Sequence, residues 1–175
     1  MRNELPMSNE PLSILVMGVS GCGKSHVGRL LGERIGAEFV DGDEYHSPAS
    51  IAKMSRGVPL SDADRADWLA TLADLFRQYR ERGRSLVIGC SALKRRYRDV
   101  LRGGAPSLKV IYLHGERDLL LERLNAREEH FFRGASLLDN QLSTLERPSG
   151  DEALQLEISD SPESIVDRAA RHLTG

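Results

Sequence analysis

The sequence predicts an α/β fold, a three-layer sandwich around a five-stranded parallel sheet. Short apolar runs alternate with helical patterns along the 175 residues, which is typical of consecutive β-α-β units. The first apolar run leads straight into a glycine-rich loop, and reactive polar residues follow the ends of later runs. Ligands bind at those ends in open parallel sheets. The length suits one domain and is short for two.

The glycine-rich loop matches the phosphate-binding pattern G-x-x-x-x-G-K-S. The apolar run Ile14–Met17 precedes it, and an apolar helical face follows as far as Ile35, where Gly36 can form a left-handed cap. A chance glycine turn is the alternative, but strand, loop and helix occur in the order that the motif requires. Lys24 would reach the β- and γ-phosphates of a nucleoside triphosphate, and Ser25 would offer its hydroxyl to Mg²⁺. The predicted nucleotide-binding residues here are Gly18, Val19, Ser20, Gly21, Cys22, Gly23, Lys24 and Ser25.

The remaining elements follow from periodicity and from capping residues. Five strands are expected, at Ile14–Met17, Glu38–Val40, Leu86–Gly89, Lys109–Leu113 and Leu156–Ile158. Beyond the helix after the loop, further helices are expected from Ser47-Pro48 to Met54, from Ser61 to about Tyr79, at about 93–102 before Gly103-Gly104, at about 116–127, from Ser136, and from Ser161-Pro162.

Composition excludes several classes of function. With a formal net charge of -2 and 40% hydrophobic residues, the chain has no bias toward nucleic acid or an anionic membrane. The basic run at 94–98 is interpreted as a solvated helix face beside a phosphate site. Cys22 and Cys90 form no metal-ligand pair, and no disulfide is expected between them in a cytoplasmic protein. Residues 1–12 lack the apolar core of a secretory signal and are expected to be a flexible extension of a single domain at 13–175.

Two aspartates follow the second predicted strand, in Asp41-Gly42-Asp43. One carboxylate can hold Mg²⁺ through water, and the other can accept a proton from a hydroxyl. An ordinary Asp-Gly turn is the alternative, but the neighbouring phosphate loop favours a functional pair. The third strand is not followed by an aspartate, and the sequence has no Asn-Lys-x-Asp run for reading guanine, which argues against a GTPase switch.

Cations between the second and third strands suit an anionic acceptor. Lys53, Arg56 and Arg65 lie there with Asp64, although a solvated helix face explains them equally well. The stretch 123–134 is charged, then aromatic, and is expected to form a mobile cover whose arginines reach the transferred phosphoryl group. His130 has no partner at ligand spacing and is interpreted as part of that cover.

Taken together, these residues resemble the bacterial-type (thermoresistant) gluconokinase family of small P-loop kinases. The resemblance spans roughly residues 14–160. The matching runs are 18–25, Asp41-Gly42-Asp43-Glu44-Tyr45-His46, 53–65 with Trp68-Leu69, Cys90-Ser91-Ala92-Leu93-Lys94 with Tyr97-Arg98-Asp99, His130-Phe131-Phe132, and 141–146 with Pro148. The runs at 53–60 and 90–94 are much more specific than the phosphate loop.

The resemblance implies a nucleoside-monophosphate-kinase-like fold with an acceptor-binding helical insert at about 44–82 and a lid at about 123–136. It implies ATP-dependent phosphorylation of D-gluconate at the 6-hydroxyl, with Mg²⁺ as cofactor, in a cytoplasmic homodimer that binds neither nucleic acid nor membrane. The product, 6-phospho-D-gluconate, would feed the pentose phosphate or Entner–Doudoroff routes.

The resemblance also assigns roles to individual residues. The implied catalytic residues are Lys24, Asp43 and Arg127; Arg123 and Arg127 would cover the nucleotide; Ser25 and, through water, Asp41 would hold the metal; and Asp43, His46, Lys53, Arg65 and Lys94 would bind the substrate. Lys53 and Arg65 are the candidates for the gluconate carboxylate.

Three positions depart from the family pattern, which usually has asparagine, proline and serine where this chain has Ser50, Asp67 and Asn140. The first puts fine specificity in question. Another small-molecule kinase, such as one for shikimate, a nucleoside monophosphate or a related aldonate, is therefore an alternative. A nucleotide-binding switch is a second alternative, from a different class.

Overall fold

The computed structural model describes residues 10–126 and 134–174 and contains the predicted parallel sheet. The strand order is β2-β3-β1-β4-β5, and every adjacent pair is parallel. The strands are β1 (Ser13–Met17), β2 (Glu38–Asp41), β3 (Leu86–Gly89), β4 (Lys109–His114) and β5 (Ala153–Glu157). The helices are α1 (Lys24–Ile35), η2 (Gly42–Tyr45, a 3-10 helix), α2 (Pro48–Ser55), α3 (Asp62–Glu81), α4 (Arg95–Gly104), α5 (Arg117–Asn125), α6 (Gly134–Thr144) and α7 (Pro162–Thr174).

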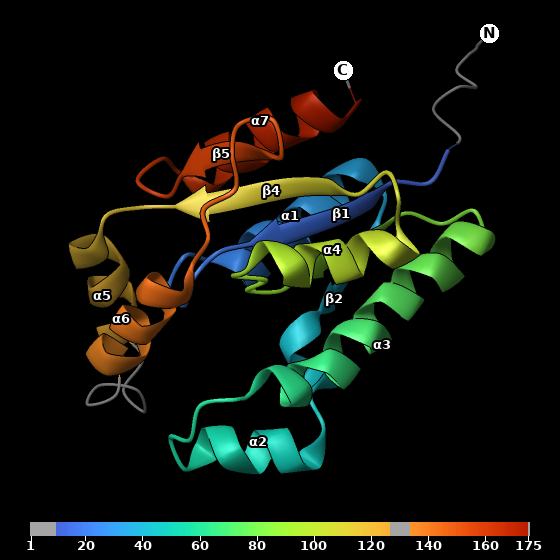
Figure 1. The fold of residues 1–175 in the computed structure, drawn as a ribbon. Helices are drawn as coiled ribbons and strands as arrows, with labels where there is room; N and C mark the ends of the chain where they lie inside the picture. Colours follow the sequence, from blue (N-terminus) through green and yellow to red (C-terminus); the bar gives the residue numbers. More distant parts are fainter. Residues whose placement is uncertain (1–9, 127–133, 175) are drawn as a thin grey trace, which may run out of the picture.

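The sheet is the middle of three layers (Figure 1). Successive residues of the buried strand β1 point to opposite faces. Ile14 and Val16 pack with α1 and α7, whereas Leu15 and Met17 pack with α3 and α4. Figure 1 shows α5 and α6 beyond the arrowhead of β4, and α2 apart from the sheet next to the start of α3. The carboxyl ends of the strands are therefore flanked by α5 and α6 and by the α2 segment.

Local capping explains where the predicted helices begin and end. Gly36 adopts a left-handed conformation (φ 75°) and ends α1 as expected. Ser61 and Asp64 form a capping box at α3, in which the Asp64 N–H donates to Ser61 Oγ (3.1 Å) and the Ser61 N–H donates to Asp64 Oδ2 (2.9 Å). Ser47 caps α2 in the same manner, by accepting from the Ser50 N–H (3.1 Å).

Element bounds differ from the sequence prediction in several places. Strand β5 begins at Ala153, three residues before the expected Leu156, because its alternating edge sequence lacks a continuous apolar run. Helix α4 continues through Gly103 and Gly104. The second glycine serves close packing rather than termination, since a Cβ there would lie 1.9 Å from the Ala73 carbonyl oxygen. Helix α6 begins at Gly134, before the expected Ser136.

Three further observations concern Leu12, the two cysteines and the lengths of the helices. Leu12, in the expected extension, donates its N–H to Ser85 Oγ (2.8 Å) and accepts from the Leu86 N–H (2.9 Å), so regular contacts begin before β1. Cys22 and Cys90 are both buried and free of disulfides, as predicted. None of the helices described is long and apolar enough to span a bilayer.

Candidate active site

The phosphate loop lies between β1 and α1, where the motif predicted it. Its three glycines, Gly18, Gly21 and Gly23, all have positive φ, at 153°, 90° and 89°. Gly23 is the N-cap of α1, supplies no side-chain acceptor, and is followed by a first turn without acidic residues. The first amides of α1 therefore lack the side-chain cap that α3 has, and they are suited to bind an anion. Lys24 and Ser25 are the first two residues of this helix.

The aspartate pair is fixed at the ends of β2 and β3. Asp41 Oδ1 accepts from the Asp43 N–H (3.0 Å) and caps the short helix η2. Gly42 packs directly on β3, because a Cβ there would lie 2.8 Å from the Gly89 carbonyl oxygen. The Trp68 indole Nε1–H donates to the Gly42 carbonyl (2.7 Å), so that α3 also holds this turn.

The charge of Lys24 acts on the carboxyl group of Asp43. Loss of hydration raises the pKa of the Asp43 carboxyl; the Asp41 charge raises it further, while Lys24 and His46 oppose the shift. The residue is nevertheless exposed to solvent. Asp43 is therefore a solvent-exposed residue whose carboxyl group is crowded by protein, and its raised pKa makes it a better proton acceptor than an ordinary aspartate.

His46 continues the site away from the phosphate loop. Its ring stacks on Trp68 with centroids 4.0 Å apart and an interplanar angle of 25°. Desolvation lowers its pKa and the Arg65 charge adds to this, while Asp43 acts in the opposite direction. Its Nδ1 atom is buried and has no hydrogen-bond partner in the described structure. The imidazole therefore favours the neutral state and retains one unsatisfied nitrogen near Asp43.

Two predicted substrate residues meet around one ring, in what we call the Tyr97 cluster: Tyr97, Arg65, Lys94, Arg96 and Asp62. The three cationic groups lie 5.6 Å (Arg65), 5.8 Å (Lys94) and 5.7 Å (Arg96) from the ring centroid. The Tyr97 hydroxyl donates to Asp62 Oδ1 (2.8 Å), and Arg96 also pairs with Asp62. The cluster thus holds three cations and one carboxylate, and this excess of positive charge suits an anion.

Lys53 stands outside the Tyr97 cluster. Its Nζ donates to both oxygens of Asp64, at 2.8 and 3.1 Å. This bond, together with the Ser61 N–H, lowers the pKa of Asp64 to about 2. Lys53 thus already has a carboxylate partner within the protein. Arg56 is the C-cap residue of α2, and we assign it no role in the site.

The predicted cover is described only in part. Arg123 Nη2 donates to the Ile158 carbonyl (2.8 Å), and its charge is close enough to the phosphate loop to act on the Cys22 thiol. Arg127 and His130 lie outside the described residues, as does most of the expected lid, so their roles stay predictions.

The interpretation of the basic run as a solvated face is wrong for Arg98, whose side chain is 1% exposed. Its guanidinium donates to Glu152 (2.8 and 3.3 Å) and to the carbonyls of Ala92, Leu93 and Glu146. Ala92 is held at φ 45°, within the loop that leads to Lys94. Arg98 therefore shapes the loop that presents Lys94, a role that charge patterning alone did not reveal.

Gln141 is a second residue whose contact was not predicted. Its Oε1 accepts from the Ser20 N–H of the phosphate loop (2.6 Å), across 121 residues of sequence. Gln141 opens one of the family-like runs in the sequence, but no chemistry pointed to a partner in the loop.

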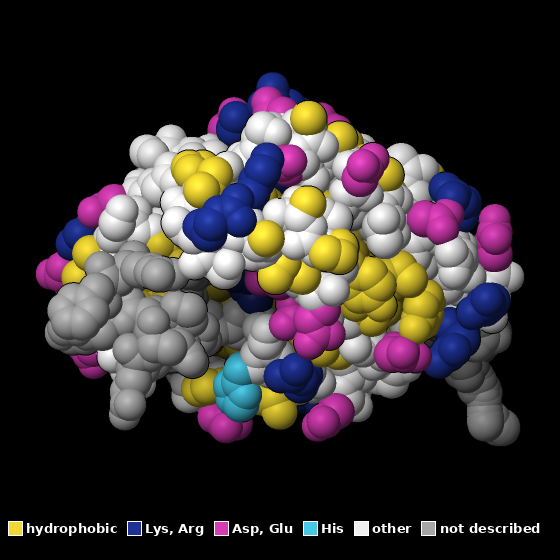
Figure 2. All heavy atoms as spheres, turned by 90° about the horizontal axis from the view of Figure 1, so that it is seen from below, with side chains coloured by type: hydrophobic (Ala, Val, Ile, Leu, Met, Phe, Trp, Pro, Cys, Tyr) yellow, Lys and Arg dark blue, Asp and Glu magenta, His cyan; other side chains and the backbone are white. Residues whose placement is uncertain are grey.

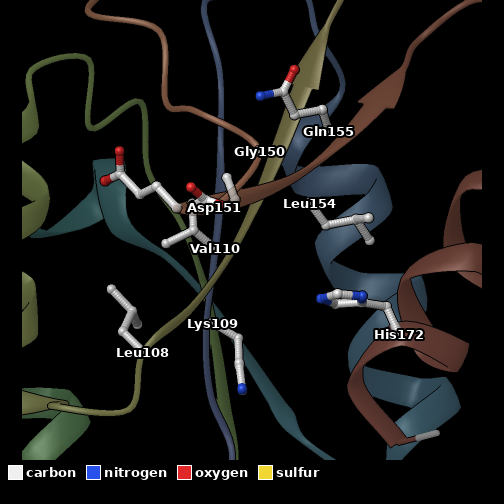
Figure 3. A pocket seen from close by; sticks show the side chains of 10 residues that line it. Leu108, Lys109, Val110, Gly150, Asp151, Leu154, Gln155 and His172 are labelled. Atoms are coloured by element: carbon white, nitrogen blue, oxygen red, sulfur yellow. The ribbon is translucent and has the colours of Figure 1, made fainter.

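The surface around these residues is uneven. Figure 2 shows the face that carries α2, where acidic and basic side chains and a histidine lie on the surface among hydrophobic groups. A cavity of about 350 Å³ lies between the start of α2 and α3 and brings together Ser50 and Asp67, two positions that depart from the family pattern. A separate cavity of about 640 Å³ lies between the β4–β5 edge and α7 (Figure 3). It contains no predicted site residue, so its size does not mark the active site.

The donors near the phosphate loop are oxygen atoms of Asp41 and Ser25. The described residues contain no group of three or more His, Cys, Asp or Glu side chains that could hold a metal ion. Mg²⁺ does not need one, since it keeps several waters and uses one or two protein oxygens with substrate phosphates. Asp41 commits Oδ1 to the Asp43 N–H and leaves its other carboxylate oxygen for a metal-bound water. With the Ser25 hydroxyl, this donor set fits Mg²⁺.

Comparisons with known proteins identify the family of the chain. A family model described as "AAA domain" matches residues 14–148. The gluconokinase of Gluconobacter oxydans is 42% identical over 171 residues, covering 97% of this chain and 96% of the relative. The crystal structure of an unliganded sugar kinase from Janibacter sp. superposes with a TM-score of 0.87 at 43% identity, covering 93% of this chain and 94% of that one. A gluconokinase structure from Sinorhizobium meliloti gives a TM-score of 0.81 at 42% identity, with coverage of 94% and 96%. The likeness extends over nearly the whole chain, and this protein belongs to the gluconokinase family of P-loop kinases.

Proposed function

We propose that the protein transfers the γ-phosphoryl group of ATP to the 6-hydroxyl of D-gluconate, giving ADP and 6-phospho-D-gluconate. The observation that carries the proposal is the phosphate loop between β1 and α1, which includes Lys24, together with Asp43 just after β2, a carboxylate of raised pKa on which the Lys24 charge acts. The identity with gluconokinases over nearly the full length of the chain supports the choice of acceptor.

In this reaction the protein mainly positions groups and stabilises charge. The loop amides and Lys24 bind the polyphosphate and balance the charge that shifts toward ADP. Asp43 accepts the proton of the acceptor hydroxyl while the oxygen of that hydroxyl forms a bond to the γ-phosphorus. The bond between this phosphorus and the bridging oxygen breaks, and ADP leaves with that oxygen. Ser25 and, through water, Asp41 would hold Mg²⁺, which supplies further compensation of phosphate charge.

The acceptor would lie between Asp43 and the Tyr97 cluster. His46 interacts electrostatically with both Asp43 and Arg65, which supports a common site for the three residues. The hydroxyl end of gluconate would lie at Asp43 and its carboxylate at Arg65 and Lys94, with His46 between them. Lys53 stays a candidate for the carboxylate only if it exchanges Asp64 for the substrate.

A panel of acceptors tests the proposal directly. ADP release is measured with D-gluconate, other aldonates, shikimate and nucleoside monophosphates, and the product is identified by mass spectrometry and NMR. We expect D-gluconate to give the highest kcat/KM, with the phosphate at carbon 6. Preference for shikimate or a nucleotide would overturn the choice of acceptor, and the absence of acceptor-stimulated turnover would favour a nucleotide switch.

A homodimer in the cytoplasm remains part of the proposal and is supported by the family resemblance alone. Sedimentation of the purified protein across a range of concentrations tests the dimer.

A further inference from the structure

Helix α6 contacts the phosphate loop through one side chain. Gln141 Oε1 lies 2.6 Å from the backbone nitrogen of Ser20, the third residue of the loop. A backbone N–H can only donate, so the amide oxygen of Gln141 must be the atom that faces it. The loop itself uses a different amide for its internal turn, in which the Cys22 N–H donates to the Val19 carbonyl (3.2 Å). Gln141 therefore binds an amide that the turn leaves free.

Contacts other than the Gln141 bond fix the position of α6. Leu138, one turn before Gln141, is 0% exposed and belongs to the core beneath α1 and α7. Asp139 accepts from Arg117 Nε and Nη2 of α5, at 2.7 and 2.9 Å. Just after the helix, the Glu146 N–H donates to the Leu93 carbonyl (2.8 Å). Gln141 is thus presented to the loop by a helix that does not depend on the Ser20 contact.

The segment Ser20-Gly21, which we call the Ser20 arm of the loop, is also held by α5. Gly21 lies against α5, where a Cβ would be 2.8 Å from the Leu120 carbonyl oxygen and 3.1 Å from Leu124. Ser20 and Gly21 therefore pack between α6 and α5, while Gly23 and Lys24 continue into α1. The arm is restrained by a hydrogen bond on one side and by close packing on the other, which leaves the amides at the start of α1 for an anion.

We propose that Gln141 is a positioning residue of the nucleotide site, which holds the Ser20 amide so that the phosphate loop is already in its binding conformation before the polyphosphate arrives. A neutral amide is suited to this role, because it supplies an acceptor without placing negative charge beside the phosphates. Loss of the bond frees one arm of the loop, and ordering that arm then opposes nucleotide binding. The inference rests on the proposed function only for the identity of the nucleotide.

Three variants and one ligand pair test the inference. Gln141→Leu removes the acceptor, and Gln141→Glu keeps an acceptor for Ser20 but adds a charge. Gln155→Leu is the matched control, because Gln155 also makes one side-chain hydrogen bond, to the Pro148 carbonyl (2.8 Å) rather than to the loop. Binding of MgATP and MgADP is measured by calorimetry, and the melting temperature and the KM for gluconate at saturating ATP are measured alongside.

We expect Gln141→Leu to weaken both nucleotides roughly three- to tenfold, as the loss of one hydrogen bond predicts. The KM for gluconate should stay within twofold, and the melting temperature should fall no further than in Gln155→Leu. Gln141→Glu should bind nucleotide more weakly than Gln141→Leu, with a deficit that shrinks as salt is added.

Native nucleotide affinity in Gln141→Leu, or an equal loss in Gln155→Leu, would overturn the inference. So would Gln141→Glu binding as tightly as the native protein, because the side chain would then not face the polyphosphate. Nucleotide binding is measured without acceptor, so a failure of the gluconate assignment would leave these outcomes readable.

Discussion

The nucleotide side and the acceptor side of the proposed site use different chemical groups. The nucleotide side consists mainly of backbone amides and two side chains from eight consecutive residues, placed by one strand–loop–helix connection. The proposed acceptor side consists of side chains from η2, α2, α3 and the start of α4, which are spread over about fifty residues of sequence. Several of these side chains already have protein partners, such as Arg65 on the Leu60 carbonyl (2.8 Å) and Lys53 on Asp64.

If the proposed roles hold, phosphate binding would depend on the loop backbone, whereas recognition of the acceptor would depend on tertiary packing. A change on the nucleotide side should therefore act on turnover with any acceptor. A change on the acceptor side should act on one substrate and should be coupled to the stability of the α2–α3 segment.

The largest effect is expected for Lys24→Ala. The loss of a cation that stabilises the transferred phosphoryl group should lower kcat by at least about a hundredfold with every acceptor tested. The fold should persist, because the side chain lies in a functional loop rather than in the core. Lys109→Ala, at an exposed position of β4, is the matched control for charge. Near-native kcat in Lys24→Ala would show that the loop is not the site of transfer.

Asp43→Asn should come next, with a fall in kcat of roughly 10²–10⁴-fold and a much smaller rise in the KM for gluconate. Since the pKa of Asp43 is raised, the carboxylate becomes protonated at a higher pH than an ordinary aspartate, and the rate should fall on acidification through that pKa. The rate of the variant should no longer fall in this pH range. A rise in KM with unchanged kcat would reduce Asp43 to a binding role.

The stability of Asp43→Asn gives an independent check. A carboxyl whose pKa is raised by folding destabilises the native state at neutral pH, where it is charged, and has no effect once both states are protonated. The variant should therefore melt at or above the native temperature at pH 7. A lower melting temperature would mean that lost activity reflects damage to the η2 turn.

The carboxylate side is tested by comparing Arg65→Lys, Lys94→Met and Lys53→Met. We expect the first two to raise the KM for gluconate roughly tenfold each, through lost charge-assisted hydrogen bonds, with nucleotide affinity unchanged. Lys53→Met should affect gluconate less, and it should raise the pKa of Asp64 from its value of about 2 because its main cause is removed. A larger KM effect in Lys53→Met would show that Lys53 exchanges Asp64 for the substrate.

Sequence reasoning succeeded where the signal is local. The loop, the Gly36 cap and the Ser61 cap each depend on neighbouring residues, and the structure confirms them. It failed where the signal is tertiary: Gly104 looked like a helix terminator until the close approach of Ala73 was known. Arg98 read as a surface cation because its partner Glu152 is 54 residues away. The same limit applies to Gln141 and Ser20, which no periodicity connects.

The smallest effect expected is that of Ser61→Ala, and it joins the two sides of the comparison. Removing the N-cap of α3 should cost about 1 kcal/mol of unfolding free energy, or about 2–4 °C in melting temperature. Ser161→Ala is the matched control, because Ser161 Oγ accepts from the Ser164 N–H (3.1 Å) at the start of α7, away from the acceptor. The two losses of stability should be similar. Only Ser61→Ala should also raise the KM for gluconate, because Arg65 lies in the first turn of α3 and moves with its cap. Equal KM values in the two variants would show that the acceptor side tolerates a loosened α3, and the coupling between recognition and stability would then be absent.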